Sequence, residues 1–409
     1  MRAVIIGNSA AGLAGAETLR RLAPQAKITI ISDEPYPPYC RPLLTYLLAG
    51  DIQERDLWLK ASDYYQKWQF EPLLGRRVVQ VDPAAKTVAL DSGESLPYDR
   101  LLVASGARPL RPGIPGENAA GVFTIRTWGE FQEMQRLLRP GLRAAVVGSG
   151  LVGIKTAQAL AQAGYHVTLV ARKAQVLSTL LDATAAALLH EALQDLGVKL
   201  RFHAVPAALA VQNGRAAAVV LTDGSEIPAD LVILGIGVRP NTEFLAAAGL
   251  SDPRGLAVDD QLRIGAADIF AAGDCVRPRD RLTGQPAYFA IWPAAVAQGR
   301  LAGANMAGYE RTYEGLLAQN TFAVGPTRMI AGGLVRPADP ACEVHTDYDA
   351  QHRRYRRLVI QDGRLVGVIL VGRVEDAGVY LSLIHNKTPL ASLPVDPRRR
   401  DFQVGRLLG

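Results

Sequence analysis

The sequence predicts an α/β protein with two similar βαβ domains, the second inserted in the first, and a smaller α+β domain towards its C-terminal end. Two observations predict the paired domains: a glycine-rich turn follows a short apolar strand and precedes a helix at residues 7–12, and again at residues 148–153. A third is that beyond about Gly315 the pattern becomes that of antiparallel strands. With 409 residues, 49% hydrophobic and 21% charged, the chain can bury two or three domain cores and is not a disordered chain.

The first βαβ unit begins with an apolar strand at residues 2–6. The turn at 7–12, Gly-Asn-Ser-Ala-Ala-Gly, leads into an amphipathic helix that runs to Leu22, and a second strand covers residues 27–31. Backbone N–H groups in such a turn, together with the positive end of the helix, suit a pyrophosphate. Ser9 stands where the motif G-x-G-x-x-G has its middle glycine, so strain or a hydroxyl contact must replace the close approach that this glycine allows.

The second unit repeats this order. A strand at 144–147 enters the complete turn Gly-Ser-Gly-Leu-Val-Gly at 148–153, a helix extends to about Ala163, and another strand covers 166–170. One glycine motif by itself is weak, but two in strand–turn–helix context favour two dinucleotide sites in two Rossmann-like domains. The alternative is a pair of unrelated glycine turns in an α/β protein.

Further apolar runs continue both domains. A buried strand at 98–103 runs into a tight turn, Ala-Ser-Gly-Ala-Arg-Pro, at 104–109, and a matching run occupies residues 229–240. Another buried strand at 268–272 ends in Gly273-Asp274. These runs predict that the chain leaves the first domain, builds the second, and then returns to complete the first.

The C-terminal segment reads as antiparallel sheet. Strands at 357–361 and 365–371 flank a hairpin turn at Asp362-Gly363. The predicted division is a first nucleotide-binding domain at 1–112 and 242–315, a second at 113–241, and a C-terminal α+β interface domain at 316–409.

Charge is distributed unevenly. Lysine and arginine number 45 against 39 aspartates and glutamates, a formal net charge of +6, and much of the excess lies in Arg353–Arg357 and Arg398–Arg400. Either these runs are solvated surface, or they dock an acidic protein partner. Nucleic-acid binding is not predicted, because no helix-turn-helix, zinc or RNA-binding signature accompanies the charge.

The sequence also bears on the compartment. Three cysteines cannot form a disulfide framework, which favours a reducing environment. The apolar start stops at Gly7, so a strand and turn explain it better than a signal peptide, and no uninterrupted apolar stretch is long enough to span a membrane. We expect a soluble, cytoplasmic protein that binds no membrane, and we predict no metal site.

Four segments together carry a resemblance to a known family. They are residues 4–12 (Val-Ile-Ile-Gly-Asn-Ser-Ala-Ala-Gly), 104–109, 146–150 and 270–274 (Phe-Ala-Ala-Gly-Asp). This combination resembles the two-dinucleotide flavoprotein reductases of the pyridine nucleotide-disulfide oxidoreductase superfamily. The similarity covers essentially the whole chain and implies FAD together with a nicotinamide cofactor, NADPH or NADH.

Two other segments narrow the branch. Tyr39–Leu44 (Tyr-Cys-Arg-Pro-Leu-Leu) and Trp292–Met306, with Ala295, Gln298 and Arg300, resemble rubredoxin and ferredoxin reductases, NADH oxidases and the flavin subunits of NADH-nitrite reductase. These motifs do not identify the electron acceptor.

The resemblance assigns FAD to the first glycine turn and the nicotinamide nucleotide to the second. Asp33 or Glu34 is implied to bind the adenosine ribose, although the family's carboxylate position falls on Ser32, and Asp274 is implied to bind the ribityl hydroxyls. The helix from Ala295 is implied to direct its positive end at the flavin. The full set of implied cofactor-binding residues is Gly7, Ser9, Ala10, Ala11, Gly12, Asp33, Glu34, Arg41, Pro42, Val78, Ala104, Ser105, Gly106, Arg108, Gly148, Gly150, Leu151, Val152, Gly153, Arg172, Lys173, Gly237, Gly273, Asp274, Trp292 and Ala295.

Nicotinamide preference is read at the end of the second strand of the second unit. An NAD site usually has an acidic residue there to bind the ribose 2′-hydroxyl, but this chain has Ala171-Arg172-Lys173. The two cations favour NADPH, or at least argue against a strong preference for NADH. The alternative is that both merely face solvent.

Two residues are candidates for catalysis, Cys40 and Lys155. No two cysteines lie close in sequence, which excludes disulfide chemistry of the glutathione-reductase kind. Cys40 is followed by Arg41-Pro42, as in relatives that need no thiol, yet a role as a single redox cysteine stays open. In the ferredoxin-reductase relatives a lysine lies about where Tyr46 is and a glutamate about where Lys155 is, so we expect different charge handling near the flavin here.

The resemblance therefore implies an FAD-dependent NAD(P)H oxidoreductase. It would pass electrons from nicotinamide through flavin to a small acidic redox protein, rubredoxin- or ferredoxin-like, or to a partner subunit. The alternatives are an NAD(P)H oxidase or coenzyme-A-disulfide or thiol reductase that uses Cys40, and a redox sensor with slow turnover. A homodimer is left open.

Overall fold

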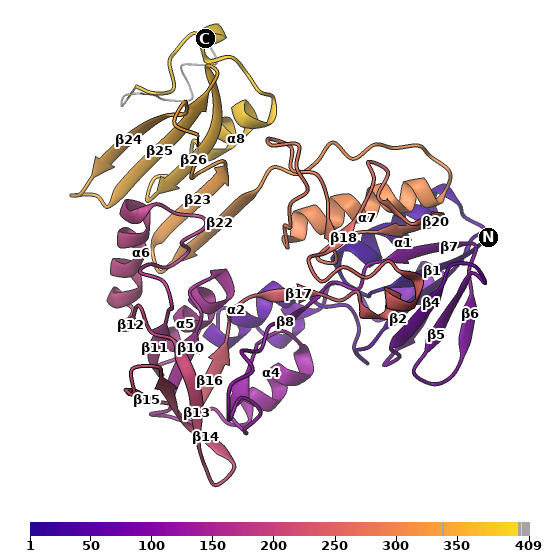
Figure 1. Ribbon diagram of the computed structural model, residues 1–409, viewed down its shortest axis with the longest axis horizontal. Coiled ribbons are helices and arrows are strands. Elements are labelled where there is room, and N and C mark those ends of the chain that lie inside the picture. Colours follow the sequence, from indigo (N-terminus) through magenta and orange to yellow (C-terminus); the bar gives the residue numbers. More distant parts are fainter. Residues whose placement is uncertain (338, 400–401, 403–409) are drawn as a thin grey trace. The chain divides into compact units, whose positions relative to one another are not determined.

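The protein is described by a computed structural model covering residues 1–337, 339–399 and 402 (Figure 1). The chain divides into two compact units. Unit 1 comprises Met1–Leu43, Ile52–Pro109 and Val238–Leu316, and unit 2 comprises Leu44–Asp51, Leu110–Gly237 and the described residues from Leu317 onward. The predicted α/β class with two Rossmann-like domains is confirmed, whereas the three-domain division stays a prediction.

Unit 1 is built on a six-stranded sheet in the order β19-β20-β7-β1-β2-β3. All neighbours pair in parallel except β19. Ile5, at the centre, faces Ile30 on one side and Leu102 on the other, and all three side chains are buried, as expected for a parallel sheet covered on both faces. The strands are β1 (Arg2–Ile6), β2 (Lys27–Ser32), β3 (Phe70–Leu74), β7 (Arg100–Val103), β19 (Arg263–Ile264) and β20 (Ala266–Ala271).

Helices α1 (Ala10–Leu22) and α7 (Trp292–Met306) pack backbone against backbone. A Cβ atom on Gly299 would stand 2.2 Å from the carbonyl oxygen of Ala11, and one on Gly303 would stand 2.4 Å from that of Gly15. Side chains at these positions would force the helices apart. The close packing fixes the start of α7 beside the first glycine turn.

Smaller elements complete unit 1. A three-stranded antiparallel sheet, β4-β5-β6, contributes to the core that covers one face of the main sheet. Strands β8 and β17, which stand where the chain leaves unit 1 and where it returns, pair antiparallel with each other. The bounds are η1 (Arg41–Leu43), η2 (Glu54–Leu57), α3 (Tyr64–Lys67), β4 (Val78–Asp82), β5 (Thr87–Leu90), β6 (Ser95–Pro97), β8 (Ala107–Pro109), β17 (Val238–Pro240), η3 (Glu243–Ala248), β18 (Leu256–Ala257) and β21 (Val276–Arg277).

Unit 2 contains a second parallel sheet, in the order β12-β11-β10-β16-β9. Helix α2 packs against α5, so the short segment Leu44–Asp51 belongs here although unit 1 surrounds it in the sequence. The elements are α2 (Leu44–Ala49), β9 (Val122–Phe123), α4 (Trp128–Gln135), β10 (Arg143–Val147), α5 (Leu151–Gln162), β11 (His166–Val170), α6 (Ala183–Asp195), β12 (Lys199–Arg201), β13 (Pro206–Gln212), β14 (Arg215–Leu221), β15 (Glu226–Pro228) and β16 (Leu231–Leu234).

The C-terminal part of unit 2 is an antiparallel sheet in the order β22-β23-β26-β25-β24 (orange to yellow in Figure 1). The predicted hairpin at Asp362-Gly363 joins β25 to β26, and both residues have positive φ, +50° and +67°. Its elements are β22 (Gln319–Val324), β23 (Thr327–Gly333), β24 (Glu343–Asp349), β25 (Arg354–Gln361), β26 (Arg364–Val371), α8 (Ala377–His385) and η4 (Leu390–Ser392). Among the described residues, no helix is long and apolar enough to cross a membrane.

Candidate dinucleotide sites

The two glycine turns are built in the same way. The N–H of Gly7 donates to the carbonyl of Ile31 at 2.8 Å, and that of Gly148 donates to the carbonyl of Val170 at 2.9 Å. Both glycines have φ near +120°, a conformation that residues with a Cβ rarely adopt. Each turn therefore leaves its first strand along the same path, with the next strand of the sheet beside it.

The third glycine of each motif is fixed by contact with the first. A Cβ on Gly12 would stand 1.9 Å from the carbonyl oxygen of Gly7, and one on Gly153 would stand 2.0 Å from that of Gly148. The helix begins against the turn at both places. This close approach aims the N–H groups of the first helical turn out of the end of the sheet, where a phosphate can be bound.

The middle positions differ, as the sequence predicts. Gly150 is exposed, precedes α5 as its N-cap, and has no atom within 4 Å of where its Cβ would be. Ser9 is the N-cap of α1, and its hydroxyl makes no capping hydrogen bond. The open space at Gly150, at the positive end of a helix, fits a diphosphate group, and at the first turn Ser9 presents a hydroxyl instead.

Three predicted FAD residues from distant parts of unit 1 lie together. A Cβ on Gly273 would stand 3.0 Å from the Cβ of Ala11 and 3.7 Å from that of Ala295. The first glycine turn, the end of β20 and the first turns of α7 thus meet at one place. Asp274 is the next residue along the chain and is partly buried.

Two neighbours of this junction were not predicted to belong to the site. The side-chain oxygen of buried Gln298 accepts the N–H of Gly273 at 2.8 Å, and Tyr288 donates its hydroxyl to the carbonyl of Asp274 at 3.0 Å. Both fix the backbone on either side of Asp274. Gln298 belongs to the motif that carries the resemblance, so its position was visible in the sequence, but Tyr288 gives no comparable signal.

The helix predicted to direct its positive end at the flavin starts earlier than expected. Helix α7 begins at Trp292, with Pro293 in its first turn, rather than at Ala295. Proline suits this position because it has no N–H to leave unpaired there. Trp292 is partly buried and packs against the core between α1 and the sheet.

Glu34 is committed to a network beside the predicted flavin-lining segment. Its carboxylate accepts Arg41 at 2.5 Å and the Tyr39 hydroxyl at 2.7 Å, and Arg41 also donates to the Tyr39 oxygen at 2.8 Å. Burial works to lower the pKa of Arg41, but Tyr39 and Glu34 outweigh it and the pKa is raised. Asp33, in contrast, is exposed. Of the two carboxylates predicted for the ribose, only Asp33 is left facing solvent.

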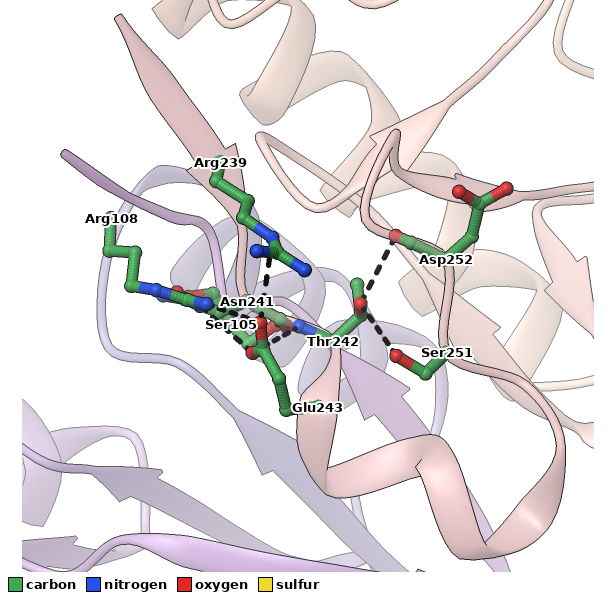
Figure 2. Close-up of polar contacts among 8 residues, drawn as sticks. All are labelled: Ser105, Arg108, Arg239, Asn241, Thr242, Glu243, Ser251 and Asp252. Atoms are coloured by element: carbon green, nitrogen blue, oxygen red, sulfur yellow. Dashed lines mark hydrogen bonds and ion pairs between the residues drawn. The ribbon is translucent and has the colours of Figure 1, made fainter. Parts of the chain in front are cut away.

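Four predicted residues lie shortly before the chain leaves unit 1, and Figure 2 shows the contacts of two of them, Ser105 and Arg108. Ser105 donates its hydroxyl to the carbonyl of Asn241 at 2.6 Å, and the Asn241 amide donates to the carbonyl of Ser105 at 3.0 Å. Arg108 donates to Glu243 at 2.8 Å, and this contact lowers the pKa of Glu243 to about 2. Ala104 and Gly106 lie in the same turn. The Ser105 and Arg108 side chains therefore tie the segment around β8 to the residues that follow β17. Asn241 was missed although it directly follows the second predicted run.

Val78 is 7% exposed, in the core cluster of unit 1 together with Val4 and Val103. The predicted contact of Val78 with the adenine stays a prediction. Pro42 lies in η1, the single turn between the network of Glu34 and helix α2.

In unit 2, the loop after β11 returns to the second glycine turn. Arg172 and Lys173 are exposed at its start, directly after buried Ala171. Farther along, the N–H of Leu177 donates to the carbonyl of Ser149 at 2.9 Å. The two cations therefore begin a loop that closes on the turn predicted to hold the nucleotide.

The other predicted residues of the second site surround its turn. Leu151 and Val152 form the first turn of α5, where Val152 is 48% exposed. Gly237 has φ +124° and is exposed, and its carbonyl accepts the N–H of Leu110. Within the described residues, no group of three or more His, Cys, Asp or Glu side chains is arranged to hold a metal ion.

Comparisons with known proteins identify this arrangement. The sequence profile of the family described as "Pyridine nucleotide-disulphide oxidoreductase" matches residues 1–299. The chain belongs to this family. Residues 328–388 match a second profile, "Rubredoxin NAD+ reductase C-terminal domain". The predicted oxidoreductase class and the predicted cofactors, FAD and NAD(P)H, are thereby confirmed for this member of the family.

Individual relatives span the chain. The NADH-dependent phenylglyoxylate dehydrogenase subunit epsilon of Aromatoleum evansii is 30% identical over 98% of this chain and 96% of its own length. Nitrite reductase [NAD(P)H] of Bacillus subtilis is 29% identical over 95% of this chain, which spans only about half, 48%, of that protein. Among solved structures, the covalent putidaredoxin reductase–putidaredoxin complex has a TM-score of 0.88 at 26% identity, covering 95% of this chain and 94% of that one.

This member of the oxidoreductase family has a half-buried cysteine beside the network of Glu34. The N–H of Cys40 donates to the carbonyl of Leu57, and its carbonyl accepts the N–H of Leu43. Burial raises the pKa of the Cys40 thiol, an effect that the N–H of Leu43 offsets only in part. The thiol is therefore favoured over the reactive thiolate near neutral pH.

Lys155 and Tyr46 contact each other within unit 2. The Lys155 Nζ lies over the Tyr46 ring and also donates to the carbonyl of Ala323 at 3.2 Å and to Gln158 at 3.0 Å. Burial lowers the pKa of this amine. Lys155 therefore links α5 to α2 and to β22.

The basic run at 353–357 is largely balanced within the chain. Arg353 pairs with Glu191 and Asp195, Arg356 with Asp347, and Arg357 with Asp182. Arg356 and Arg357 are thus paired within the chain and only partly exposed, whereas Arg353 and Arg354 are exposed. In the second run, Arg398 pairs with Asp396, and Arg400 lies outside the described residues.

Proposed function

We propose that this protein is an FAD-dependent NAD(P)H oxidoreductase that delivers electrons to a small redox protein or to a partner subunit. The observation that carries the proposal is the pair of matching glycine turns, one in each unit, each leading into the N-terminus of a long helix. The family's C-terminal rubredoxin-reductase domain and the putidaredoxin complex among similar structures support a redox protein as acceptor.

Different residues of unit 1 would bind different parts of FAD. The amides after Gly7 and Ser9 would bind the diphosphate, Asp33 the ribose, and Asp274 the ribityl chain. Gly273 lets these parts approach one another closely, since a side chain there would reach Ala11. Bound FAD supplies the chemistry that takes two electrons from a nicotinamide and releases them to one-electron acceptors.

The residues of unit 2 would hold the nicotinamide nucleotide. Gly148, Gly150 and Gly153 would form the turn for its diphosphate, and Arg172 and Lys173, directly after β11, would recognise the adenosine ribose. Two cations and no carboxylate favour the 2′-phosphate of NADPH. The relative from Aromatoleum evansii is NADH-dependent, so the preference has to be measured.

Two finer points belong to the same proposal. A thiol whose pKa is raised supports electron transfer without a Cys40 redox step. A cytoplasmic location is supported by three free cysteines.

The test is an anaerobic rapid-mixing experiment on the purified protein. Flavin absorbance is followed after mixing with NADPH or NADH, and the reduced enzyme is then offered rubredoxin, a [2Fe–2S] ferredoxin, coenzyme-A disulfide, a quinone and oxygen. The proposal predicts reduction by at least one nucleotide and the fastest reoxidation by an iron–sulfur protein. Fastest reoxidation by oxygen or by coenzyme-A disulfide would replace it with an oxidase or thiol reductase.

A further inference from the structure

The loop at residues 171–182, hereafter the nucleotide loop, carries an unusual conformation. Leu177 is buried, 4% exposed, and has φ +46°, a region that bulky side chains rarely adopt. Its N–H donates to the carbonyl of Ser149 in the glycine turn. Backbone strain of this kind persists only where surrounding contacts enforce it, and it is concentrated at binding sites.

The enforcing contacts come from the C-terminal sheet. Arg336, which follows β23, donates to the carbonyl of Ser178. On β25, the Tyr355 hydroxyl donates to Asp182 at 2.5 Å and Arg357 donates to the same carboxylate oxygen at 3.2 Å. Both side chains of the Arg357–Asp182 pair are only 18% exposed, so solvent screens the pair little.

Asp182 connects this contact to the loop and to α6 at once. One carboxylate oxygen accepts the N–H of Ala185 at 3.0 Å and caps the helix, and the other accepts Tyr355 and Arg357. Gln175, inside the loop, donates to the carbonyl of Leu181 at 3.1 Å. The end of the loop is therefore fixed by the helix and by the sheet together.

We propose that Arg336, Tyr355 and Arg357 are positioning residues for nucleotide binding: they hold the nucleotide loop in its strained, binding-competent conformation. The inference rests on the proposed nucleotide site at the second glycine turn. Without these contacts the loop populates relaxed conformations, and the apparent dissociation constant rises by the inverse of the competent fraction. The C-terminal domain thus takes part in nucleotide affinity, in addition to any role towards the electron acceptor.

The chain contains a matched control at the other end of the same helix. Arg353 donates to Asp195 at 2.5 Å and lies 3.2 Å from Glu191, in the last turns of α6. It thus joins the same strand region to the same helix, without touching the loop. If all these contacts were purely structural, removing the Arg353 contacts or the contacts of Tyr355 and Arg357 would destabilise unit 2 to a similar extent. Neither change would then affect nucleotide binding selectively.

The experiment compares FAD-loaded wild type with Tyr355→Phe/Arg357→Met, Arg336→Met and Arg353→Met. Flavin reduction is measured at rising NADPH and NADH, which separates the half-saturating concentration from the limiting rate, and Tm is recorded for each protein. For the double variant and Arg336→Met we expect half-saturation to rise by about threefold to tenfold with an unchanged limiting rate. We expect Arg353→Met to keep the wild-type half-saturation whatever its Tm.

Unchanged half-saturation in the double variant, or an equal rise in Arg353→Met, would overturn the inference. If the double variant does not fold, Tyr355→Phe alone, which removes a single oxygen atom, carries the same expectation in a smaller rise. A wild-type flavin that neither nucleotide reduces would overturn the proposed function itself, and the inference with it, so the two failures are distinguishable.

Discussion

The Nζ of Lys155 lies 4.9 Å from the centre of the Tyr46 ring. These are the two positions at which the resemblance implies a glutamate and a lysine. In this chain a cation over an aromatic face joins α5 to α2 at these positions. In the chain, α2 directly follows η1, the turn that contains Arg41 and Pro42, which are both predicted to line the FAD.

The first prediction concerns this contact. Tyr46→Leu removes the aromatic face and should lower the free energy of unfolding by about 1 kcal/mol, whereas Tyr46→Phe keeps the face and should cost much less. Denaturant unfolding followed by circular dichroism measures both. Equal losses in the two variants would show that the hydroxyl, not the ring, makes the contact that matters.

The second prediction concerns Asp274. Asp274→Ala should weaken FAD binding by about 1–3 kcal/mol, because it removes the partly buried carboxylate that we propose bonds the ribityl hydroxyls. The flavin-to-protein ratio after dialysis, with fluorescence titration of FAD into the apoprotein, gives the value. Asp91→Ala, at an exposed carboxylate, is the control. Full flavin occupancy in Asp274→Ala would remove Asp274 from the FAD site.

The third prediction concerns Cys40. Since burial raises the pKa of its thiol, we expect Cys40→Ser to keep most of the NAD(P)H-to-ferricyanide activity and its full flavin content. Thiol titration of the native protein should reveal no change in flavin absorbance. A large loss of turnover with intact FAD would favour the thiol-reductase alternative.

The fourth prediction concerns the two cations after β11. Arg172→Ala/Lys173→Ala should raise the half-saturating NADPH concentration by about tenfold, the equivalent of one lost charge-assisted hydrogen bond, and should affect NADH less. Lys199→Ala, at an exposed lysine on the neighbouring strand β12, is the control for the loss of a surface cation outside the loop. Equal effects on the two nucleotides would mean that the cations do not read the 2′-phosphate.

The fifth prediction concerns pH. His190 on α6 accepts the N–H of Val176 at 3.2 Å, and burial lowers its pKa below the ordinary 6.5. The unfolded chain therefore binds this proton first as pH falls, so the stabilising contribution is full above pH 6.5 and is lost between 6.5 and the folded pKa. The loss is about 1.4 kcal/mol for each unit of pKa difference.

Unfolding free energies measured between pH 7.5 and pH 5 test this. His190→Gln should flatten the dependence, whereas His166→Gln, at an exposed histidine, should leave it as in wild type. A wild-type slope that survives in His190→Gln would assign the titration to another group.

How far the sequence predicts the molecule depends on how local each feature is. The turns at Gly7 and Gly148 are set by neighbouring residues, so their place and shape could be predicted, as could the hairpin at Asp362-Gly363. Arg108 and Glu243 are 135 positions apart in the sequence, and Arg357 and Asp182 are 175 apart. No local sequence pattern predicts contacts between such distant residues. The same holds for Glu34. The sequence shows a carboxylate that follows a strand, but it does not show that this carboxylate forms an ion pair with Arg41.

Residues Leu44–Asp51 belong to unit 2 although residues of unit 1 flank them in the sequence, and this limits where the chain can be cut into fragments. Cutting the gene at the two ends of residues 110–237 would yield a fragment in which α5 lacks its neighbour α2, and a remainder in which α2 has lost α5. Proteolysis at the two ends of residues 110–237 should therefore produce pieces that stay associated through the contact between α2 and α5. Genetic recombination at those two points would also separate α2 from α5. This favours inheritance of the two units together, as one continuous chain.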